Sequence, residues 1–160
     1  SAFKNEEVNY YNLFLSCGNS KSTKLHCGHS KKNDQIVKTI SYFNPNTNEK
    51  CQDLFKYNLI GEILPIQGKE SIKDNYKHYE TLNSNTKSLL GSIEVLNLNC
   101  KSLIADRKKI ADAVFSLPDD RLLIDTTITN LEIPNPVTGF LDPMCSVSIF
   151  FLKQKLKTIV

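Results

Sequence analysis

A chain of 160 residues with a net charge of +3 and 23% charged residues fits one globular domain and excludes a disordered, highly charged tail. The charge is evenly spread, because residues 1–80 hold 11 basic and 9 acidic side chains and residues 81–160 hold 9 and 8. Arg107 and Arg121 are the two arginines among 20 basic residues, so we expect no nucleic acid partner.

No stretch of the sequence is long and apolar enough to cross a bilayer, and we expect no transmembrane span. The chain begins at Ser1 without a methionine. This start indicates a processed or truncated N-terminus, and we expect that a signal or anchor segment has been removed from view.

The first third of the chain alternates apolar and polar segments. Aromatic residues in Val8–Ser16 predict a strand, and residues 18–34 predict a Lys-rich surface loop. Residues 35–43 combine helical spacing with β-branched content, so helix and strand stay open there. Asn44–Asn48 has the composition of a turn, because Pro45 fixes φ and asparagine tolerates left-handed backbone.

Three weaker elements follow before residue 89. Residues 49–57 predict a short helix, and residues 59–66 predict a strand that ends near Pro65. Tyr76, Tyr79 and Leu82 share a helical face, so a helix is expected over residues 71–82. Residues 83–88 are expected to form a loop.

The C-terminal framework, residues 89–156, is the predicted scaffold of the domain. Alternating apolar residues predict a strand over 92–98, and helical spacing predicts a helix over 103–117 that Pro118 stops. Residues 121–133 and 146–152 predict two further strands, joined as a long hairpin. Lys153, Lys155 and Lys157 would then share one face of an edge strand and guard it against pairing.

These elements predict a single α+β domain over residues 1–160, with a mixed or mostly antiparallel sheet and two or three short helices. Asp119 and Asp120 are interpreted as a capping turn after the helix rather than a cation site, because adjacent residues converge poorly. The nucleotide-binding and hydrolase motifs with regular glycine spacing are absent from the sequence, and we expect no cofactor.

Cysteine usage bears on the compartment. The chain has an odd number of cysteines, and their spacing fixes no pairing; the disulfide candidates are Cys17, Cys27, Cys51, Cys100 and Cys145. Cys17 precedes the Lys-rich loop and Cys27 lies inside it, and a bridge between them would stabilise the fold by roughly 3 kcal/mol in an oxidising compartment. The alternative is that the cysteines are buried free thiols.

The densest group of reactive side chains lies in the same loop. Cys17, His26, Cys27 and His29 are zinc-ligand types, with Cys51 as a further candidate, but no C-x₂-C pair is present and His26 and Cys27 are adjacent. We therefore expect no metal site, and a Lys-rich loop that contains two histidines is the plain alternative. A nucleophilic Cys27 or Cys51 with one of the two histidines as base is a second alternative.

The leading hypothesis is a noncatalytic, exported or cell-envelope domain that acts through contacts with an unidentified protein partner. It would serve a secretion or envelope assembly, or act on a host protein as a virulence effector. The 16 asparagines form no N-x-S/T sequon, which favours a bacterial protein of the periplasm, envelope or secreted fraction. The alternatives are a small Cys/His-dependent hydrolase or transferase and a zinc-binding interaction module.

Overall fold

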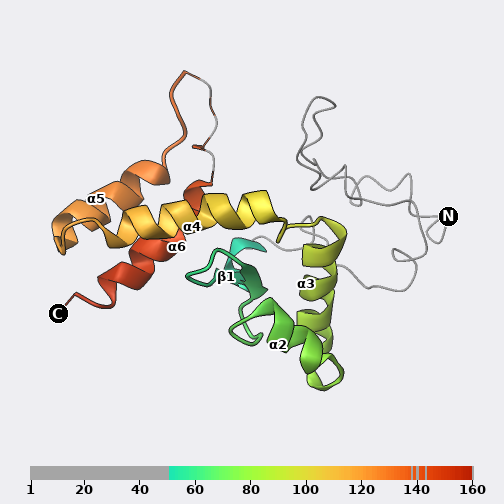
Figure 1. Cartoon of the computed structure of the whole chain (residues 1–160). Helices are drawn as coiled ribbons and strands as arrows, with labels where there is room; N and C mark the ends of the chain where they lie inside the picture. The colour runs from blue at the N-terminus through green and yellow to red at the C-terminus, as the bar shows by residue number, and fades with distance from the viewer. Residues whose placement is uncertain (1–50, 138, 140, 143, 160) are drawn as a thin grey trace.

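The computed structural model describes residues 51–159 apart from 138, 140 and 143. The expected α+β class with an antiparallel sheet is confirmed, although the described residues hold five α-helices rather than two or three (Figure 1). The elements follow the chain in this order: 3-10 helix η4 (Cys51–Leu54), strands β1 (Phe55–Tyr57) and β2 (Ile63–Pro65), helix α2 (Ile72–Lys77), 3-10 helix η5 (Tyr79–Thr81), and helices α3 (Ser84–Val95), α4 (Lys101–Phe115), α5 (Arg121–Leu131) and α6 (Cys145–Leu156). No helix in this part of the chain is long and apolar enough to span a bilayer.

Strands β1 and β2 form an antiparallel hairpin in which Tyr57 pairs with Ile63. The Gly61 amide donates to the Asn58 carbonyl at 2.9 Å and closes the turn, and Gly61 has a φ of +91°. A Cβ at Gly61 would overlap the carbonyl oxygen of Ile104 in α4. The turn therefore requires glycine at position 61 for two reasons: the backbone is left-handed there, and it lies too close to α4 to leave room for a side chain.

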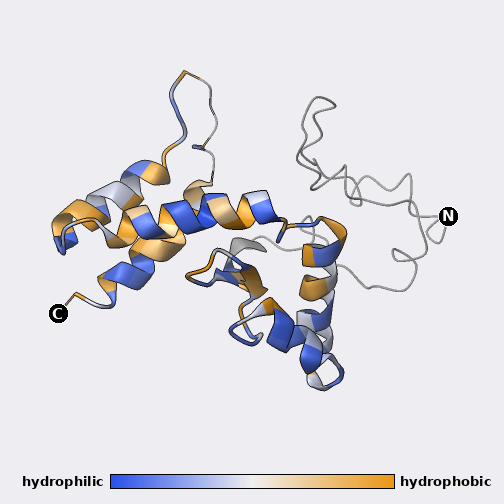
Figure 2. Cartoon of the chain, in the orientation of Figure 1, coloured by the Kyte–Doolittle hydropathy of each residue, from blue (hydrophilic) through white to orange (hydrophobic). Residues whose placement is uncertain are grey.

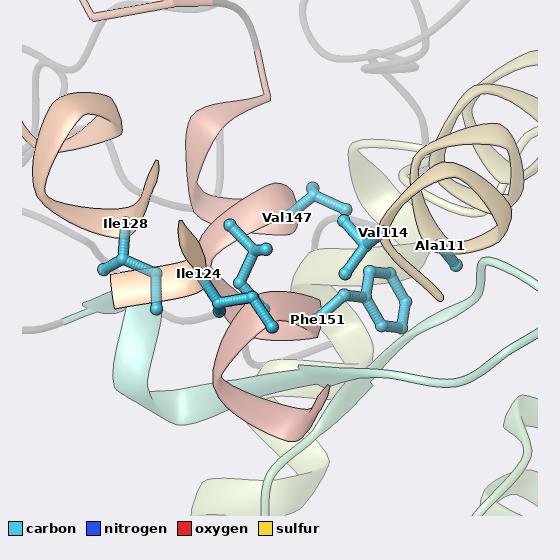
Figure 3. Packing of buried hydrophobic residues seen from close by; sticks show 7 residues of the cluster. Ala111, Val114, Ile124, Ile128, Val147 and Phe151 are labelled. Carbon is cyan, nitrogen blue, oxygen red and sulfur yellow. The ribbon is translucent and has the colours of Figure 1, made fainter. Parts of the chain in front are cut away.

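Helices α4, α5 and α6 enclose the main hydrophobic core. Helices α4 and α5 each contribute two buried side chains about one helical turn apart, and α6 contributes three; Figure 3 shows these side chains gathered between the helices. The core side chains are Ala111 and Val114 of α4, Ile124 and Ile128 of α5, and Val147, Phe151 and Leu152 of α6. Phe151 is 1% exposed and is among the largest fully buried side chains in the described residues.

A second apolar layer joins the hairpin to α3. Ile63 and Leu64 of β2 are buried, as are Leu89, Leu90 and Ile93 of α3, and the two elements pack against each other. Strand β1 instead packs against α6. The hairpin thus lies between α3 and the three C-terminal helices, as Figure 1 shows.

The predicted strand over residues 121–133 is wrong, because residues 121–131 form helix α5. The Asp120 side chain accepts the Leu123 amide at 3.1 Å and caps the start of α5, whereas the capping turn was expected only as the end of the preceding helix. Thr126 and Thr127 donate their hydroxyls to carbonyls four residues earlier, at 2.8 and 2.7 Å. These bonds satisfy the threonines inside a helix, so the β-branched composition does not prevent it.

The predicted strands over 92–98 and 146–152 are also helical, and the long hairpin between 121–133 and 146–152 does not exist. Asn83 caps α3 by accepting the Thr86 amide at 2.8 Å, so residues 83–88 start a helix rather than form a loop. Lys153, Lys155 and Lys157 were expected to share one face of an edge strand, but residues two positions apart on a helix point in different directions. Lys155 is buried, whereas Lys153 and Lys157 are exposed.

Other predictions come closer to the structure. The helix expected over 103–117 is confirmed as α4 and ends before Pro118, and the helix expected over 71–82 is present as α2 followed by η5. The strand expected over 59–66 shrinks to β2, because Leu59 and Ile60 lie in the exposed turn. The short helix expected over 49–57 is η4 followed by β1 in its described part. The predictions for Val8–Ser16 and residues 18–48 lie outside the described residues.

Candidate functional site

An aromatic contact between β1 and α6 lies between two grooves on the surface, and its two side chains line both of them. The rings of Tyr57 and Phe150 meet edge to face, with centroids 5.3 Å apart and planes at 77°. Because Phe150 and Phe151 are adjacent on α6, their side chains point in different directions. Phe151 enters the core, and the half-buried Phe150 forms a wall of both grooves.

The hairpin groove lies on the side of the β1–β2 turn and has a volume of about 470 Å³. Its apolar walls carry two exposed side chains, Leu59 at 63% and Phe115 at 40% exposure. Figure 2 shows hydrophobic colour at this turn. The groove is lined by Lys56, Tyr57, Asn58, Leu59, Glu70, Phe115, Phe150, Phe151, Gln154 and Thr158.

The charged side chains of the hairpin groove neutralise each other. Lys56 Nζ lies 2.8 Å from a carboxylate oxygen of Glu70 and also donates to the Gly68 carbonyl at 3.1 Å. Asn58 donates to the Glu70 carbonyl at 3.2 Å, which holds the same strip of chain against the hairpin. The groove therefore offers apolar area and uncharged polar groups rather than a net charge.

The junction groove lies on the other side of the Tyr57–Phe150 contact, where the described chain begins, and has a volume of about 290 Å³. Its rim carries the exposed Asp53 and an ion pair of 3.8 Å between Lys153 and Glu132. The groove is lined by Asp53, Phe55, Tyr57, Leu131, Glu132, Leu141, Cys145, Ser146, Ile149, Phe150 and Lys153.

A buried arginine fixes the hairpin that both grooves share. The Arg107 guanidinium donates to the carbonyls of Leu98 at 2.6 Å and Gly61 at 3.2 Å, and it lies 5.8 Å from the centre of the Tyr57 ring. Burial lowers the pKa of Arg107 below its usual value. Since carbonyls and an aromatic face surround the cation, Arg107 positions Tyr57 rather than binding a ligand.

Lys155 fixes the other side of the hairpin groove. Its side chain is 5% exposed, and its Nζ lies 2.8 Å from Asp119 and 3.4 Å from the Phe115 carbonyl at the end of α4. A cation at this position also suits the negative end of the helix dipole. The contact joins α6 to the end of α4 and so places Phe115 beside the groove.

The residues singled out in the sequence are not brought together in the described part of the chain. Cys17, His26, Cys27 and His29 lie outside it, as does the side chain of Cys51. Cys100 and Cys145 are free, half-buried thiols that precede α4 and begin α6. His78 ends α2, and no interaction in this part of the chain joins it to a cysteine.

Metal and catalytic chemistry gain no support from these positions. Within the described residues, no three His, Cys, Asp or Glu side chains gather to hold a metal ion. The Cys/His and zinc alternatives therefore rest on residues outside the described chain.

Comparisons with protein-family models, with curated proteins and with solved structures gave no match for this chain. The two grooves and the chemistry of their walls are therefore the features of the described chain that bear on its function.

Sequence reasoning missed the groove residues because no motif marks them. A usable signal was present in the adjacent pair Phe150 and Phe151. On one helix, neighbouring aromatics point about 100° apart, so a core that takes one leaves the other near the surface. Leu59 and Ile60 were a weaker signal of exposed apolar surface, because they precede Gly61 in a turn that is too short to bury both side chains.

Proposed function

We propose that the protein is a noncatalytic binding domain that acts through protein–protein contacts, and that the hairpin groove receives an apolar segment of the partner. The observation that carries this proposal is the pair of exposed side chains, Leu59 and Phe115, on the rim of a groove walled by Tyr57 and Phe150. Aromatic side chains are enriched at protein interfaces, and tyrosine is enriched among the few residues that carry most of the binding energy.

The chemistry of the groove defines the partner segment. Since Lys56 and Glu70 are paired with each other, a charged ligand would find no unpaired opposite charge on these two residues. Asn58, Gln154 and Thr158 offer uncharged groups that can bond to a peptide backbone. The proposed occupant is therefore an uncharged, apolar stretch of another protein, with one or two large side chains seated beside Phe115.

The test is peptide selection on the full chain from a random displayed library, followed by affinity measurement on variants. We expect the selected peptides to be apolar, and Leu59→Asp to weaken their binding at least tenfold. Phe115→Asp should do the same, and circular dichroism and thermal unfolding establish that each variant is folded.

The matched control is Leu122→Asp, because Leu122 is 77% exposed on α5 and lines neither groove. Affinity should be unchanged in this variant. Equal losses in all three variants would overturn the proposal, as would selected peptides that bind Leu59→Asp as tightly as the original chain. Binding to phosphatidylcholine vesicles in place of peptides would assign the groove to a membrane surface and also overturn it.

We also propose that the domain is exported, to the periplasm, the cell envelope or the medium, where it serves an assembly or contacts a host protein. The support is the cysteine pattern, with Cys17 before the Lys-rich loop and Cys27 inside it. Peptide mapping without reduction, after blocking of free thiols, tests it in the full chain. A bridge between Cys17 and Cys27 is expected, and five free thiols after isolation under oxidising conditions would overturn it.

A further inference from the structure

We infer that the protein associates with itself, and that the occupant of the hairpin groove is the loop after α5 of a second copy of this chain. The docking element is Ile133–Val137, called the proline loop below. This inference rests on the proposed function, because it names the source of the apolar segment that the groove receives. Three observations carry it: the exposure of the loop, its chemical match to the groove, and its position relative to the groove in one copy.

The proline loop is exposed along its whole length. Ile133 and Val137 are 60% and 91% exposed, and the three residues between them are exposed as well. Val137 has the largest exposed fraction among the large hydrophobic side chains of the described residues. Four of the five side chains of the loop are apolar, so its exposed apolar surface is continuous in sequence rather than scattered. A continuous apolar surface in water is typical of a site that meets another molecule.

The backbone of the proline loop is already restricted. The Val137 amide donates to Asn135 Oδ1 at 2.9 Å, and the Gly139 amide donates to the Asn135 carbonyl at 2.8 Å. Pro134 and Pro136 fix the backbone angle φ at two further positions. A restricted segment loses less conformational entropy when it binds, which suits the loop to insertion into a groove.

The loop and the hairpin groove match in their chemistry. The proline loop carries no charged residue, and Lys56 and Glu70 of the groove are paired with each other. The groove has aromatic walls, which include Tyr57, Phe115 and Phe150. Grooves lined by aromatic side chains are a recurring docking site for segments that contain proline. The proline loop thus has each property that the groove requires of its occupant.

A polar contact is available as well. Because Pro134 and Pro136 have no amide hydrogen, the carbonyl oxygens are the main polar groups of the loop backbone. The half-buried Gln154 lines the groove, and its carboxamide can donate a hydrogen bond to such a carbonyl. An uncharged donor of this kind orients an apolar segment without requiring a charge on it.

The loop and the groove of one copy lie apart. Leu131 and Glu132, which lead into the loop, line the junction groove, on the other side of the Tyr57–Phe150 contact. Figure 1 shows the chain after α5 leading away from the helices. The exposure of Val137 leaves it free of its own copy. The loop and the groove are therefore both open in one copy and meet between two copies, reciprocally in a pair or head to tail in a chain.

The test is sedimentation equilibrium of the full chain at concentrations up to about 1 mM, where weak dimers are populated. We expect the original chain to self-associate, and Leu59→Asp in the groove and Val137→Asp in the loop each to weaken the association at least tenfold. Both positions are exposed, so the fold should persist, and circular dichroism checks this. Non-reducing electrophoresis of the same samples identifies any disulfide-linked dimer.

Leu122→Asp is the matched control, because it places the same charge on another exposed leucine that belongs to neither the loop nor the groove. Its self-association should equal that of the original chain. Equal weakening in all three variants would mean that added charge alone prevents association, and it would overturn the inference. Self-association that neither Leu59→Asp nor Val137→Asp weakens would overturn it too.

An equimolar mixture of Leu59→Asp and Val137→Asp tests whether the loop and the groove meet each other. Each variant alone lacks one half of the contact. The mixture combines the intact loop of Leu59→Asp with the intact groove of Val137→Asp. We expect one-to-one dimers that form at least tenfold more tightly than either variant associates alone. A mixture that associates no better than its components overturns the inference, because the loop and the groove would then serve separate contacts.

This test also separates self-association from the proposed function. An original chain that binds the selected apolar peptides but stays monomeric up to about 1 mM overturns the self-association and leaves the groove as a site for a different protein. A chain that stays monomeric and selects no apolar peptide overturns both.

Discussion

Asn99 pairs with Ile63 as a neighbouring strand would. The Ile63 amide donates to Asn99 Oδ1 at 2.8 Å, and Asn99 Nδ2 donates to the Ile63 carbonyl at 3.0 Å. The same Oδ1 accepts from Arg107 at 3.3 Å. One side chain thus satisfies both backbone groups of Ile63 and links β2 to the buried guanidinium.

Replacing Asn99 by leucine should therefore destabilise the protein by about 2 kcal/mol. The substitution leaves two backbone groups of the nearly buried Ile63 without partners, each of which costs roughly 1–3 kcal/mol when desolvated. Asn99→Asp should lower the free energy of unfolding less than Asn99→Leu does, because aspartate keeps the acceptor for the Ile63 amide and places a carboxylate beside Arg107. Urea denaturation measures the free energies of unfolding.

Asn130→Ala is the control for this pair, since Asn130 is exposed on α5 and should shift the unfolding free energy by no more than about 0.5 kcal/mol. If Asn99→Leu were as mild as this control, the paired hydrogen bonds would contribute nothing to the stability of the hairpin.

Gly61→Ala and Gly139→Ala separate backbone strain from steric overlap. Both glycines have positive φ, +91° and +70°, so alanine at either position costs about 1–2 kcal/mol in strain. A Cβ at Gly61 also overlaps the Ile104 carbonyl, whereas one at Gly139 meets nothing within 4 Å. We expect Gly61→Ala to lower the thermal midpoint clearly more than Gly139→Ala. Equal midpoints would show that the turn can move away from α4 freely.

Lys155 and Asp119 form a pair with one buried and one exposed member, with side-chain exposures of 5% and 76%. Asp119→Asn leaves a largely buried ammonium without its carboxylate and should cost roughly 1 kcal/mol, discounted for the exposure of Asp119. Lys155→Met replaces the cation by an apolar chain of similar size and should cost less. Thermal unfolding of both single variants and of the double variant tests this order, which a larger loss in Lys155→Met would contradict.

Tyr76 should make the stability fall at alkaline pH. Partial desolvation of Tyr76, which remains 41% exposed, together with the charge of Glu94 and a 3.0 Å hydrogen bond to it, raises the pKa of Tyr76 above its usual value of about 10. Below pH 10, both the folded and the unfolded state keep the phenol proton, so the contribution of Tyr76 is intact. Above pH 10 the unfolded chain releases this proton while the folded chain holds it, and the stability declines.

The measurement is the unfolding free energy of the original chain and of Tyr76→Phe between pH 7 and pH 11. The advantage of the original chain should shrink as the pH rises above 10, since phenylalanine has no proton to release. Parallel curves for the two proteins would rule out this linkage.

The sequence allowed α4 to be predicted because its apolar residues recur at helical spacing and Pro118 marks its end. Helix α5 was missed although Ile124, Ile128 and Leu131 have the same spacing. Its β-branched residues weighed more in the prediction than the spacing did. In the structure, packing against α6 decides the conformation, because tertiary contacts override local propensity.

The grooves were harder to predict for a different reason. Each is built from residues far apart in the chain, such as Lys56 and Gln154, and no local pattern encodes their meeting. The side chains that position the walls, Arg107 and Lys155, look like ordinary surface charges in the sequence. Their burial depends on the carbonyl of Leu98, in the turn between α3 and α4, and on the carbonyl of Phe115, the last residue of α4.

The placement of the hairpin has a consequence for how the molecule opens. Strand β2 packs on α3 and strand β1 on α6, and the two strands hydrogen-bond to each other. Neither α3 nor the group of α4, α5 and α6 can detach from the hairpin without exposing apolar surface on the strand that it covers. Local opening of the two parts should therefore be cooperative, with the hairpin amides exchanging their hydrogens together and among the slowest in the described chain.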